Sequence, residues 1–370
     1  MDFEPSEELT AARDLAEQIF QGSVTPERVK TVEATDDRID RDLWRALADA
    51  HLLGLCLPED VGGSGLGLQE LCAVLEQQGR VVAPVPLYAT VVLGALPIAR
   101  FGTAEQRQAW LPGVAAGDTI LTAGLAQPGV DDPTRPTARA IADGPRWRLD
   151  GLQLCVPAAH LAARVLVPAR TDDGPAVFLV APDSPGVELE RAVTTNREVQ
   201  PHVHLDGATG EPLGDPDDRR RVLPWMVDRA LLGLCALQVG VCEAAIALAA
   251  EYTSQRVQFG KPLATFQGVA LRAADGYIDT EAMRVTMQQA AWRLDVGRDA
   301  TSDVLVAKWW ASEGGQHVVH NAQHLHGGMG ADVDYPVHRY FLWGKQIEDT
   351  LGGASALLAR LGETLAGAAR

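Results

Sequence analysis

The sequence predicts an α+β protein whose three blocks run helical, β-rich and helical. Three observations lead to this expectation. Apolar residues recur at helical spacing near the amino terminus, short β-prone segments follow, and long segments rich in Ala and Leu end the chain. The corresponding domains are an N-terminal all-α domain at 1–115, a middle β-domain at 116–214 and a C-terminal helical bundle at 215–370.

The first block reads as helices interrupted by one irregular loop. Apolar residues fall at helical spacing between Leu43 and Leu53 and again between Leu68 and Leu75. Between these runs, the segment Leu57–Gly67 contains one Pro and four Gly, which predict a loop.

The middle block reads as strands of an antiparallel barrel or sandwich. Its segments are short, rich in β-prone residues and divided by Gly, Pro and Asp, and several alternate apolar with polar residues. The expected strand segments are Thr119–Ala126, Thr137–Ile141, Trp147–Val156, Ala163–Arg170, Ala176–Ala181 and Val203–Asp206.

The last block begins after the charged run Asp215–Arg221, which is typical of a solvated boundary. Long helices rich in Ala and Leu pack as a bundle. The expected helices are Leu232–Glu251, Phe266–Leu294, Asp303–His324 and a last one after Gly353.

The composition describes an acidic chain, with a formal charge of −17. Nucleic acid and anionic membranes repel such a surface, so neither is expected as a partner. No stretch approaches about 18 uninterrupted apolar residues, and the acidic start M-D-F-E-P-S-E-E lacks the features of a signal peptide, so we expect a cytoplasmic protein without a membrane span. The five cysteines are widely spread without a C-x-x-C pair, which favours buried reduced thiols.

Four motifs occur in order along the chain. The loop L-P-E-D-V-G-G-S-G begins at Leu57, and E-Y-T-S-Q-R-V-Q-F-G-K-P-L-A-T-F-Q ends at Gln267. H-L-H-G-G-M-G follows at His324–Gly330, and Y-P-V-H-R-Y-F at Tyr335–Phe341. In residue type, order and spacing these motifs resemble the acyl-CoA dehydrogenase family over essentially the whole chain. The resemblance implies that family's fold, in which a helical domain, an antiparallel β-barrel or sandwich and a four-helix bundle follow one another.

The matched residues suit a dinucleotide. Arg256 carries a fixed fork of donors for phosphate oxygens, Phe259 a flat face for adenine, and the paired glycines let backbone N–H groups approach an anion. Singly, a helix cap and a plain turn explain Arg256 and the glycines equally well. The resemblance implies contact with the ADP half of an FAD that the neighbouring subunit holds. The expected cofactor-binding residues are Arg256, Gln258, Phe259, Gln267, His324, Gly327 and Gly328.

The catalytic carboxylate of the family is missing from both of its usual places. That family removes the α-proton of an acyl-CoA with a Glu or Asp while the β-hydrogen leaves as hydride to the flavin, and an apolar pocket raises the pKa of the base. Counting from the motifs puts Leu351 at one position of the base and Ala230 at the other. Glu348 or Asp349 could serve only if the loop were shifted, and exposed helix-end acids beside Lys345 are the more ordinary explanation.

The flavin-facing loop also departs from the family. The stretch Ala126–Pro136 has Gln127 where relatives carry an acid and lacks their small G-S-D turn. After Trp147–Gly151, the segment L-Q-L-C-V-P lacks the hydroxyl and aromatic groups that line the flavin in relatives. His324 replaces a frequent Gln, a change that keeps a hydrogen-bond donor.

The residues expected to contact the ADP half of FAD are all present, whereas the catalytic base is missing. Together these observations imply a subunit that depends on a partner. The chain resembles the non-catalytic (beta) subunit of actinobacterial α2β2 heterotetrameric acyl-CoA dehydrogenases that shorten steroid side chains, such as that of cholesterol. FAD would be shared with the catalytic subunit, and electron-transfer flavoprotein or a similar acceptor would take the electrons. Two alternatives remain: a self-sufficient homotetramer that uses an unusual base such as Glu348, and a structural or regulatory homologue without flavin.

Several histidines occur close together in the sequence near the last motif. His317, His320 and His324 fall close to one helical face, with His326 and Glu313 nearby. No cysteine accompanies them, and the segment coincides with the expected FAD contact, so we expect no metal site.

Overall fold

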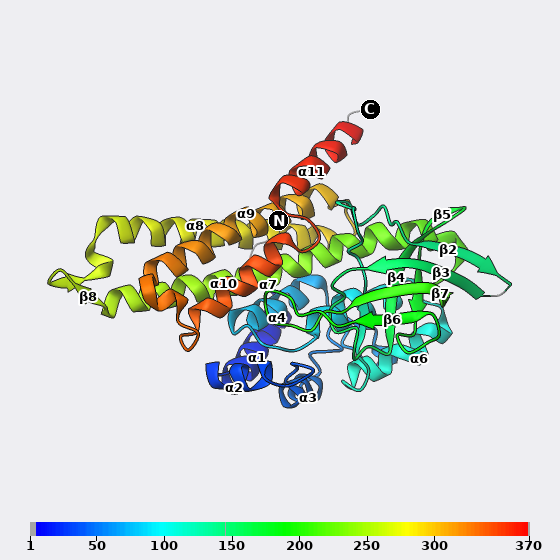
Figure 1. Ribbon diagram of the computed structural model, residues 1–370, viewed down its shortest axis with the longest axis horizontal. Helices are drawn as coiled ribbons and strands as arrows, with labels where there is room; N and C mark the ends of the chain where they lie inside the picture. The colour runs from blue at the N-terminus through cyan, green and yellow to red at the C-terminus, as the bar shows by residue number, and fades with distance from the viewer. Residues whose placement is uncertain (1–4, 145, 369–370) are drawn as a thin grey trace. The chain divides into compact units, whose positions relative to one another are not determined.

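The structure is a computed structural model that describes residues 5–144 and 146–368 (Figure 1). Its helices are α1 (Glu7–Ser23), α2 (Pro26–Glu33), α3 (Arg41–Asp49), α4 (Leu68–Arg80), α5 (Leu96–Phe101), α6 (Ala104–Ala115), α7 (Arg219–Gln255), α8 (Gln267–Asp295), α9 (Thr301–His326), α10 (Val337–Asp349) and α11 (Ala354–Ala368). Its strands are β1 (Leu121–Ala123), β2 (Arg139–Asp143), β3 (Arg146–Gln153), β4 (Arg164–Thr171), β5 (Gly174–Val180), β6 (Val187–Glu190), β7 (His202–Pro212), β8 (Val257–Gln258) and β9 (Lys261–Pro262).

The order of these elements is helical, then β, then helical, which confirms the predicted fold class. The chain divides into two compact units. The helical unit contains the described parts of Met1–Arg28, Cys72–Ala83 and Leu231–Arg370, and the β unit contains Val29–Leu71 and the described parts of Pro84–Ala230. The domain boundaries near residues 115 and 214 stay a prediction.

The helical unit is built around the carboxyl-terminal part of α7, which contacts α8, α9 and α10. Arg284 of α8 donates to Glu243 of α7 at 2.8 Å, and Gln238 of α7 reaches the carbonyl of Gly344 in α10 at 3.4 Å. Gly240 is required where α7 crosses α4, because a Cβ there would lie 1.9 Å from the carbonyl oxygen of Glu76. The four helices α7 to α10 therefore pack closely, as expected for a bundle.

By length and composition alone, one helix of the described residues, Pro216–Gln255, could cross a membrane. The length of uninterrupted apolar stretches in the sequence did not predict this helix as a candidate membrane span. Within the protein, 72% of its most apolar 18-residue window is buried, as expected of a central bundle helix.

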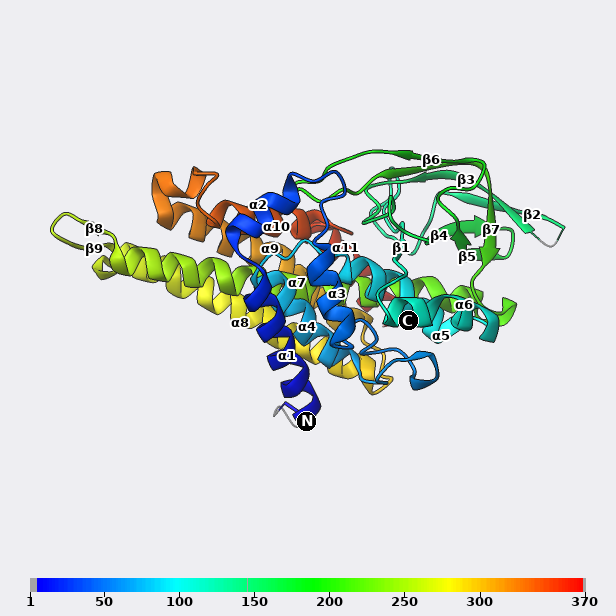
Figure 2. The same cartoon turned by 90° about the horizontal axis from the view of Figure 1, so that it is seen from below.

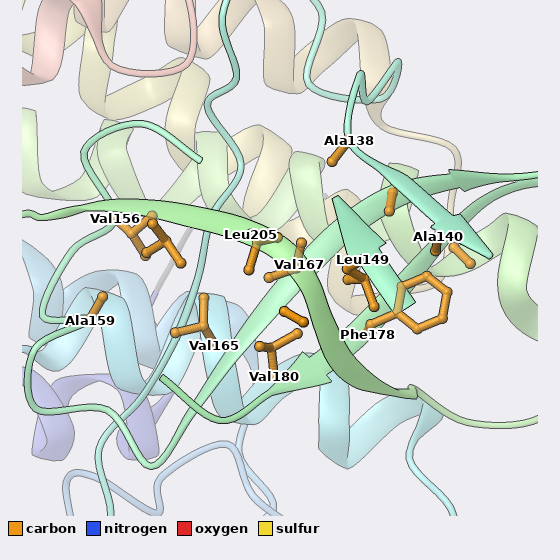
Figure 3. Packing of buried hydrophobic residues seen from close by; sticks show 14 of the residues in the cluster. Ala138, Ala140, Leu149, Val156, Ala159, Val165, Val167, Phe178, Val180 and Leu205 are labelled. Carbon is orange, nitrogen blue, oxygen red and sulfur yellow. The ribbon is translucent and has the colours of Figure 1, made fainter. Parts of the chain in front are cut away.

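The β unit contains a closed ring of strands. Strands β4, β2, β3, β7 and β5 pair in sequence and β5 returns to β4, while β1 joins β4 and β6 joins β7. Figure 3 shows Leu149, Val167 and Phe178 among the apolar side chains of its core. Most pairings are antiparallel as expected, but β1 and β2 pair in parallel with β4. Strand β4 therefore has two parallel neighbours, β1 and β2, and one antiparallel neighbour, β5. The composition of the segments cannot reveal this topology.

Local structure departs from the expected segments in four places. The irregular loop after Leu57 contains a short 3-10 turn, Glu59–Val61. Strand β6 and the π-helical segment η2 (Tyr88–Ala95) go beyond the expected elements. The charged run that we expected to be a boundary supplies the first residues of α7, which begins at Arg219.

Candidate functional site

The first group of predicted cofactor-binding residues lies where α7 ends. The amide of Arg256 donates to the carbonyl of Tyr252 at 2.8 Å, and the chain then forms the β8–β9 hairpin. In Figure 2 this hairpin lies at the tip of the helix pair α7 and α8. Phe259 and Gly260 at its turn have φ values of 54° and 81°, the left-handed pair that a tight two-residue hairpin requires.

Phe259 has a conformation that is costly for its residue type. A bulky side chain at positive φ is strained, and such strain is typical of binding sites. The ring is 88% exposed and forms an edge-to-face pair with Phe266, with ring centroids 6.1 Å apart. An aromatic ring held out in this way has a free face for a planar ligand.

The polar members of the group also point to solvent. Arg256, Gln258 and Gln267 are all exposed. Among the described residues, none of their side chains has a hydrogen-bond or ion-pair partner. Unpaired donors on an exposed hairpin and helix start are available to an external ligand.

The second group lies at the end of α9. Helix α9 ends at His326, and Gly327 follows with φ 56° and ψ −132°, a conformation that only glycine adopts readily. No atom lies within 4 Å of where a Cβ would stand at Gly327 or Gly328. The backbone here is therefore open to close approach, and the exposed His324 stands one turn before it.

A ring stack joins the two groups. His326 stacks on Tyr252 of α7 with centroids 4.8 Å apart and 26° between the planes, and it also lies 5.1 Å from Tyr335. Its Nδ1 lies 2.7 Å from the carbonyl oxygen of Ala322, and burial lowers the pKa of the imidazole. A neutral, buried His326 thus ties the end of α7 to the end of α9. Both predicted groups consequently share one end of the helical unit.

This end of the unit fits the ADP side of an FAD. A phosphate needs charge-assisted and backbone donors, which Arg256 and the turn Gly327–Gly328 offer. An adenine needs a flat apolar face, which Phe259 offers. The assignment of individual residues to the cofactor stays a prediction.

The two residues that we expected at the family's base positions have aliphatic side chains. Leu351 lies in the turn between α10 and α11 with φ 59°. Ala230 is fully buried in α7, and its carbonyl accepts a hydrogen bond from Tyr88 Oη at 3.1 Å. Neither side chain can accept a proton.

Glu348 does not have the setting of a free base. Its carboxylate is paired with Lys345, and only 15% of the side chain is exposed. The reading of Glu348 as an exposed helix-end acid is therefore wrong, because the last turn of α10 folds against α9. Asp349, one residue later, is exposed.

A buried cation holds the turn that carries Leu351. Lys308 of α9 is completely buried, and its Nζ donates to Ser312 Oγ at 2.8 Å and to the carbonyls of Ile347 at 3.0 Å and Gly352 at 3.3 Å. Burial lowers the pKa of Lys308 to about 8. The expected site residues did not include it; its only signal in the sequence is a lysine inside the apolar run of α9.

In the β unit, the side-chain amide of Gln127 forms hydrogen bonds within the protein. The side chain is buried, and its Nε2 donates to Gln153 Oε1 at 3.1 Å and to the carbonyl of Pro168 at 3.0 Å. Its Oε1 accepts from the amide of Ala138 at 2.9 Å and from the hydroxyl of Thr137 at 2.9 Å. Both amide hydrogens and the oxygen of Gln127 are therefore engaged in holding the loop to the strands. The side chain has no hydrogen-bonding group left for a cofactor.

The histidine cluster is dispersed over separate contacts. His317 lies 3.7 Å from Asp279 and 3.6 Å from Glu313, whereas His320 packs on Phe341. Within the described ranges, no group of three or more His, Cys, Asp or Glu side chains is arranged to hold a metal ion. All five cysteines are free thiols; Cys72, Cys235 and Cys242 are buried, and the other two are partly exposed.

Known proteins resemble the chain over nearly its full length. The acyl-CoA dehydrogenase N-terminal domain matches residues 6–118 and the C-terminal domain matches residues 222–362. The acyl-CoA dehydrogenase FadE27 of Mycobacterium tuberculosis is 40% identical, covering 99% of both chains. Among solved structures, a variant of the Tcur3481–Tcur3483 steroid ACAD shares 52% identity with a TM-score of 0.94, covering 98% of this chain and 99% of that one. The ChsE4–ChsE5 complex of Mycobacterium tuberculosis shares 40% identity with a TM-score of 0.93 and covers 99% of each chain. Together with the fold, these matches place the chain in the acyl-CoA dehydrogenase family.

Proposed function

We propose that this chain is the non-catalytic subunit of an FAD-dependent acyl-CoA dehydrogenase and works only with a catalytic partner subunit. The observation that carries the proposal is an asymmetry. The surface suited to the ADP side of FAD is open and has unpaired donors, whereas both base positions are aliphatic and Gln127 is engaged within the protein. A homo-oligomer of such chains would contain no complete site, but a hetero-oligomer would contain one for each pair of unlike subunits.

FAD would supply the hydride acceptor for the α,β-dehydrogenation of an acyl-CoA thioester in this assembly. This chain contributes binding rather than proton transfer. Arg256 and the backbone at Gly327–Gly328 would hold phosphate oxygens, and Phe259 would cover the adenine. Gln258, Gln267 and His324 would donate to polar groups of the nucleotide. The partner supplies the carboxylate and most of the acyl pocket.

The similar structures support a heteromeric assembly with a steroid substrate. Two of them are named as assemblies of two different chains, Tcur3481–Tcur3483 and ChsE4–ChsE5, and the first is named a steroid ACAD. We propose an α2β2 heterotetramer that acts on a steroid side-chain CoA ester, such as one derived from cholesterol, in the cytoplasm. Electron-transfer flavoprotein or a similar acceptor is the proposed oxidant of the flavin.

Expression of the chain alone and with a Glu-bearing acyl-CoA dehydrogenase subunit of the same genome tests the proposal. We expect a colourless, inactive protein alone, and a yellow, active complex with equal subunit amounts after co-expression. A flavin spectrum and the stoichiometry of the purified complex are the measurements. Bound flavin that is bleached by an acyl-CoA when the chain is pure would overturn the proposal in favour of a self-sufficient enzyme. A colourless product in every co-expression would favour a homologue without flavin.

A further inference from the structure

The ring of His326 lies between the two groups of proposed FAD contacts. His326 is the last residue of α9, so it directly precedes Gly327 in the chain. Its ring stacks on Tyr252 of α7 with centroids 4.8 Å apart, and the carbonyl of Tyr252 accepts the amide hydrogen of Arg256 at 2.8 Å. A single ring contact therefore connects the turn at Gly327 to the backbone that carries Arg256.

The position of this ring is fixed by its surroundings. His326 is only 2% exposed, and Tyr335 forms a second ring contact with it at 5.1 Å. Tyr335 in turn packs against a buried apolar cluster that includes Leu325 and Val337. Close packing of this kind leaves a side chain little freedom to shift. The stack thus holds the ends of α7 and α9 in one defined arrangement.

The hydrogen bonds of His326 select its neutral form. Nδ1 donates to the carbonyl of Ala322 at 2.7 Å, because a carbonyl oxygen only accepts. Nε2 is buried, and within the described part of the chain it has no hydrogen-bond partner. A proton on Nε2 would be a buried donor without an acceptor, which is costly. The ring is therefore an uncharged spacer rather than a ligand for a phosphate.

The glycine turn is also fixed at its far end. Gln323 of α9 donates from Nε2 to the carbonyl of Gly330 in the turn Gly327–Ala331. A Cβ at Gly330 would lie 2.6 Å from the carbonyl oxygen of Gln323, so the turn passes close to the helix there. Because α9 holds both ends of the turn, the place of the turn relative to Arg256 depends on how α9 meets α7.

A cofactor that contacts two protein groups needs them at a fixed separation. Such groups must be held within about 0.5 Å of the productive geometry. We propose that His326 is a positioning residue of the FAD half-site, whose stack on Tyr252 sets the separation between Arg256 and the glycine turn. It acts through these groups and does not itself touch the cofactor. This role rests on the proposed function, since it presupposes that FAD reaches both groups.

Two substitutions separate the ring from its hydrogen bond. His326→Phe keeps a flat ring for Tyr252 but has no donor for Ala322, whereas His326→Asn keeps a donor and loses the ring. In the complex with the co-expressed catalytic subunit, His326→Asn is expected to weaken FAD binding by about tenfold, and His326→Phe by less than about twofold. His320→Asn is the matched control, because His320 packs on Phe341 of α10, and it should leave FAD binding unchanged. Titration of the flavin-depleted complex with FAD measures the affinity.

A double-mutant cycle distinguishes positioning from a general loss of stability. If His326 places Arg256 relative to the turn, His326→Asn should cost little further affinity once Arg256→Ala is present. Fully additive losses would mean that the ring only supports the fold, and the positioning role would be wrong. The melting temperature of each chain alone is the control for folding. Tyr252→Leu removes the other half of the stack and replaces His326→Asn if that variant does not fold.

The outcomes separate the positioning role from the proposed function. A wild-type chain that forms no yellow complex overturns both before any variant is made. If Arg256→Ala weakens FAD binding but His326→Asn binds FAD as the wild type does, the proposed function stands and the positioning role is wrong. It is also wrong if His326→Phe loses as much affinity as His326→Asn, since the hydrogen bond rather than the stack would then matter. An unchanged affinity in Arg256→Ala overturns it as well, because no contact would remain to be positioned.

Discussion

Replacing Lys308 by Met removes the cation that holds the turn between α10 and α11. The ammonium group donates to the carbonyls of Ile347 and Gly352 at 3.0 and 3.3 Å, and to Ser312 Oγ at 2.8 Å. Helix α10 ends at Asp349, so the carbonyl of Ile347 has no later helical amide to accept from. Met fills a similar volume but leaves these acceptors unpaired, at about 1–3 kcal/mol for each buried group.

The free energy of unfolding should also change with pH in a defined direction. Burial lowers the pKa of Lys308 to about 8 from the ordinary value of 10.5. Between these pH values the unfolded chain binds a proton on Lys308 that the folded chain does not, so the free energy of unfolding rises with pH. At about 1.4 kcal/mol per pH unit, the interval corresponds to about 3 kcal/mol. The Lys308→Met variant lacks this dependence.

The assay is urea unfolding of both proteins at pH 7.5 to 10.5, followed by tryptophan fluorescence, because buried Trp343 lies in α10. We expect the wild-type protein to gain about 3 kcal/mol relative to the variant across this range. Hydrogen exchange of the turn around Leu351 should be faster in the variant at pH 7.5, where the ammonium form of Lys308 still predominates in the folded chain. A constant difference between the two proteins at all pH values, with unchanged exchange in the turn, would refute this reasoning.

Three further predictions concern the helical unit. Arg256→Ala should lower the FAD affinity of the complex by about tenfold to a hundredfold, which is the loss expected for a charge-assisted hydrogen bond. The melting temperature of the chain alone should stay unchanged. Flavin titrations that give equal affinities for the wild-type and variant complexes would contradict this. Arg284→Met should destabilise the chain by about 3–5 kcal/mol in urea unfolding, because Glu76 would lose its ion pair with Arg284 in a largely buried site, while Glu243 would keep its pair with Arg80. Arg41→Met, at an exposed pair with Asp37, should change the free energy of unfolding by less than about 1 kcal/mol. Phe259→Gly should preserve or raise the stability of the chain alone by about 1 kcal/mol while it lowers flavin retention in the complex, and a loss of stability would show that Phe259 supports the fold instead.

The long helices and most strands could be predicted because their signals are local. Apolar spacing predicted α8 from Phe266 to Leu294, and the structure begins and ends it within one residue of these positions. The parallel pairing of β1 with β4 could not be predicted in this way, because it joins Leu121 to Arg164 across an intervening hairpin. Strand pairing depends on contacts that composition does not record.

The candidate site was likewise predictable only in part. Motif spacing located Arg256 and Gly327, but it did not indicate that the ring of His326 on Tyr252 ties their segments together. Nor did it show that Gln127 is fully engaged by hydrogen bonds, since its partners Gln153 and Pro168 lie 26 and 41 residues away. Hydrogen-bond satisfaction is a property of the folded chain.

By itself, the sequence determined that the two residues predicted at the base positions cannot take a proton. Leu351 and Ala230 have no ionisable group in any conformation, and this holds before folding is considered. Only the tertiary structure decided that Glu348 is paired with Lys345 and that Lys308 is buried beneath the turn. The identity of a side chain is local, whereas its protonation, partners and exposure depend on segments that meet only when the chain folds.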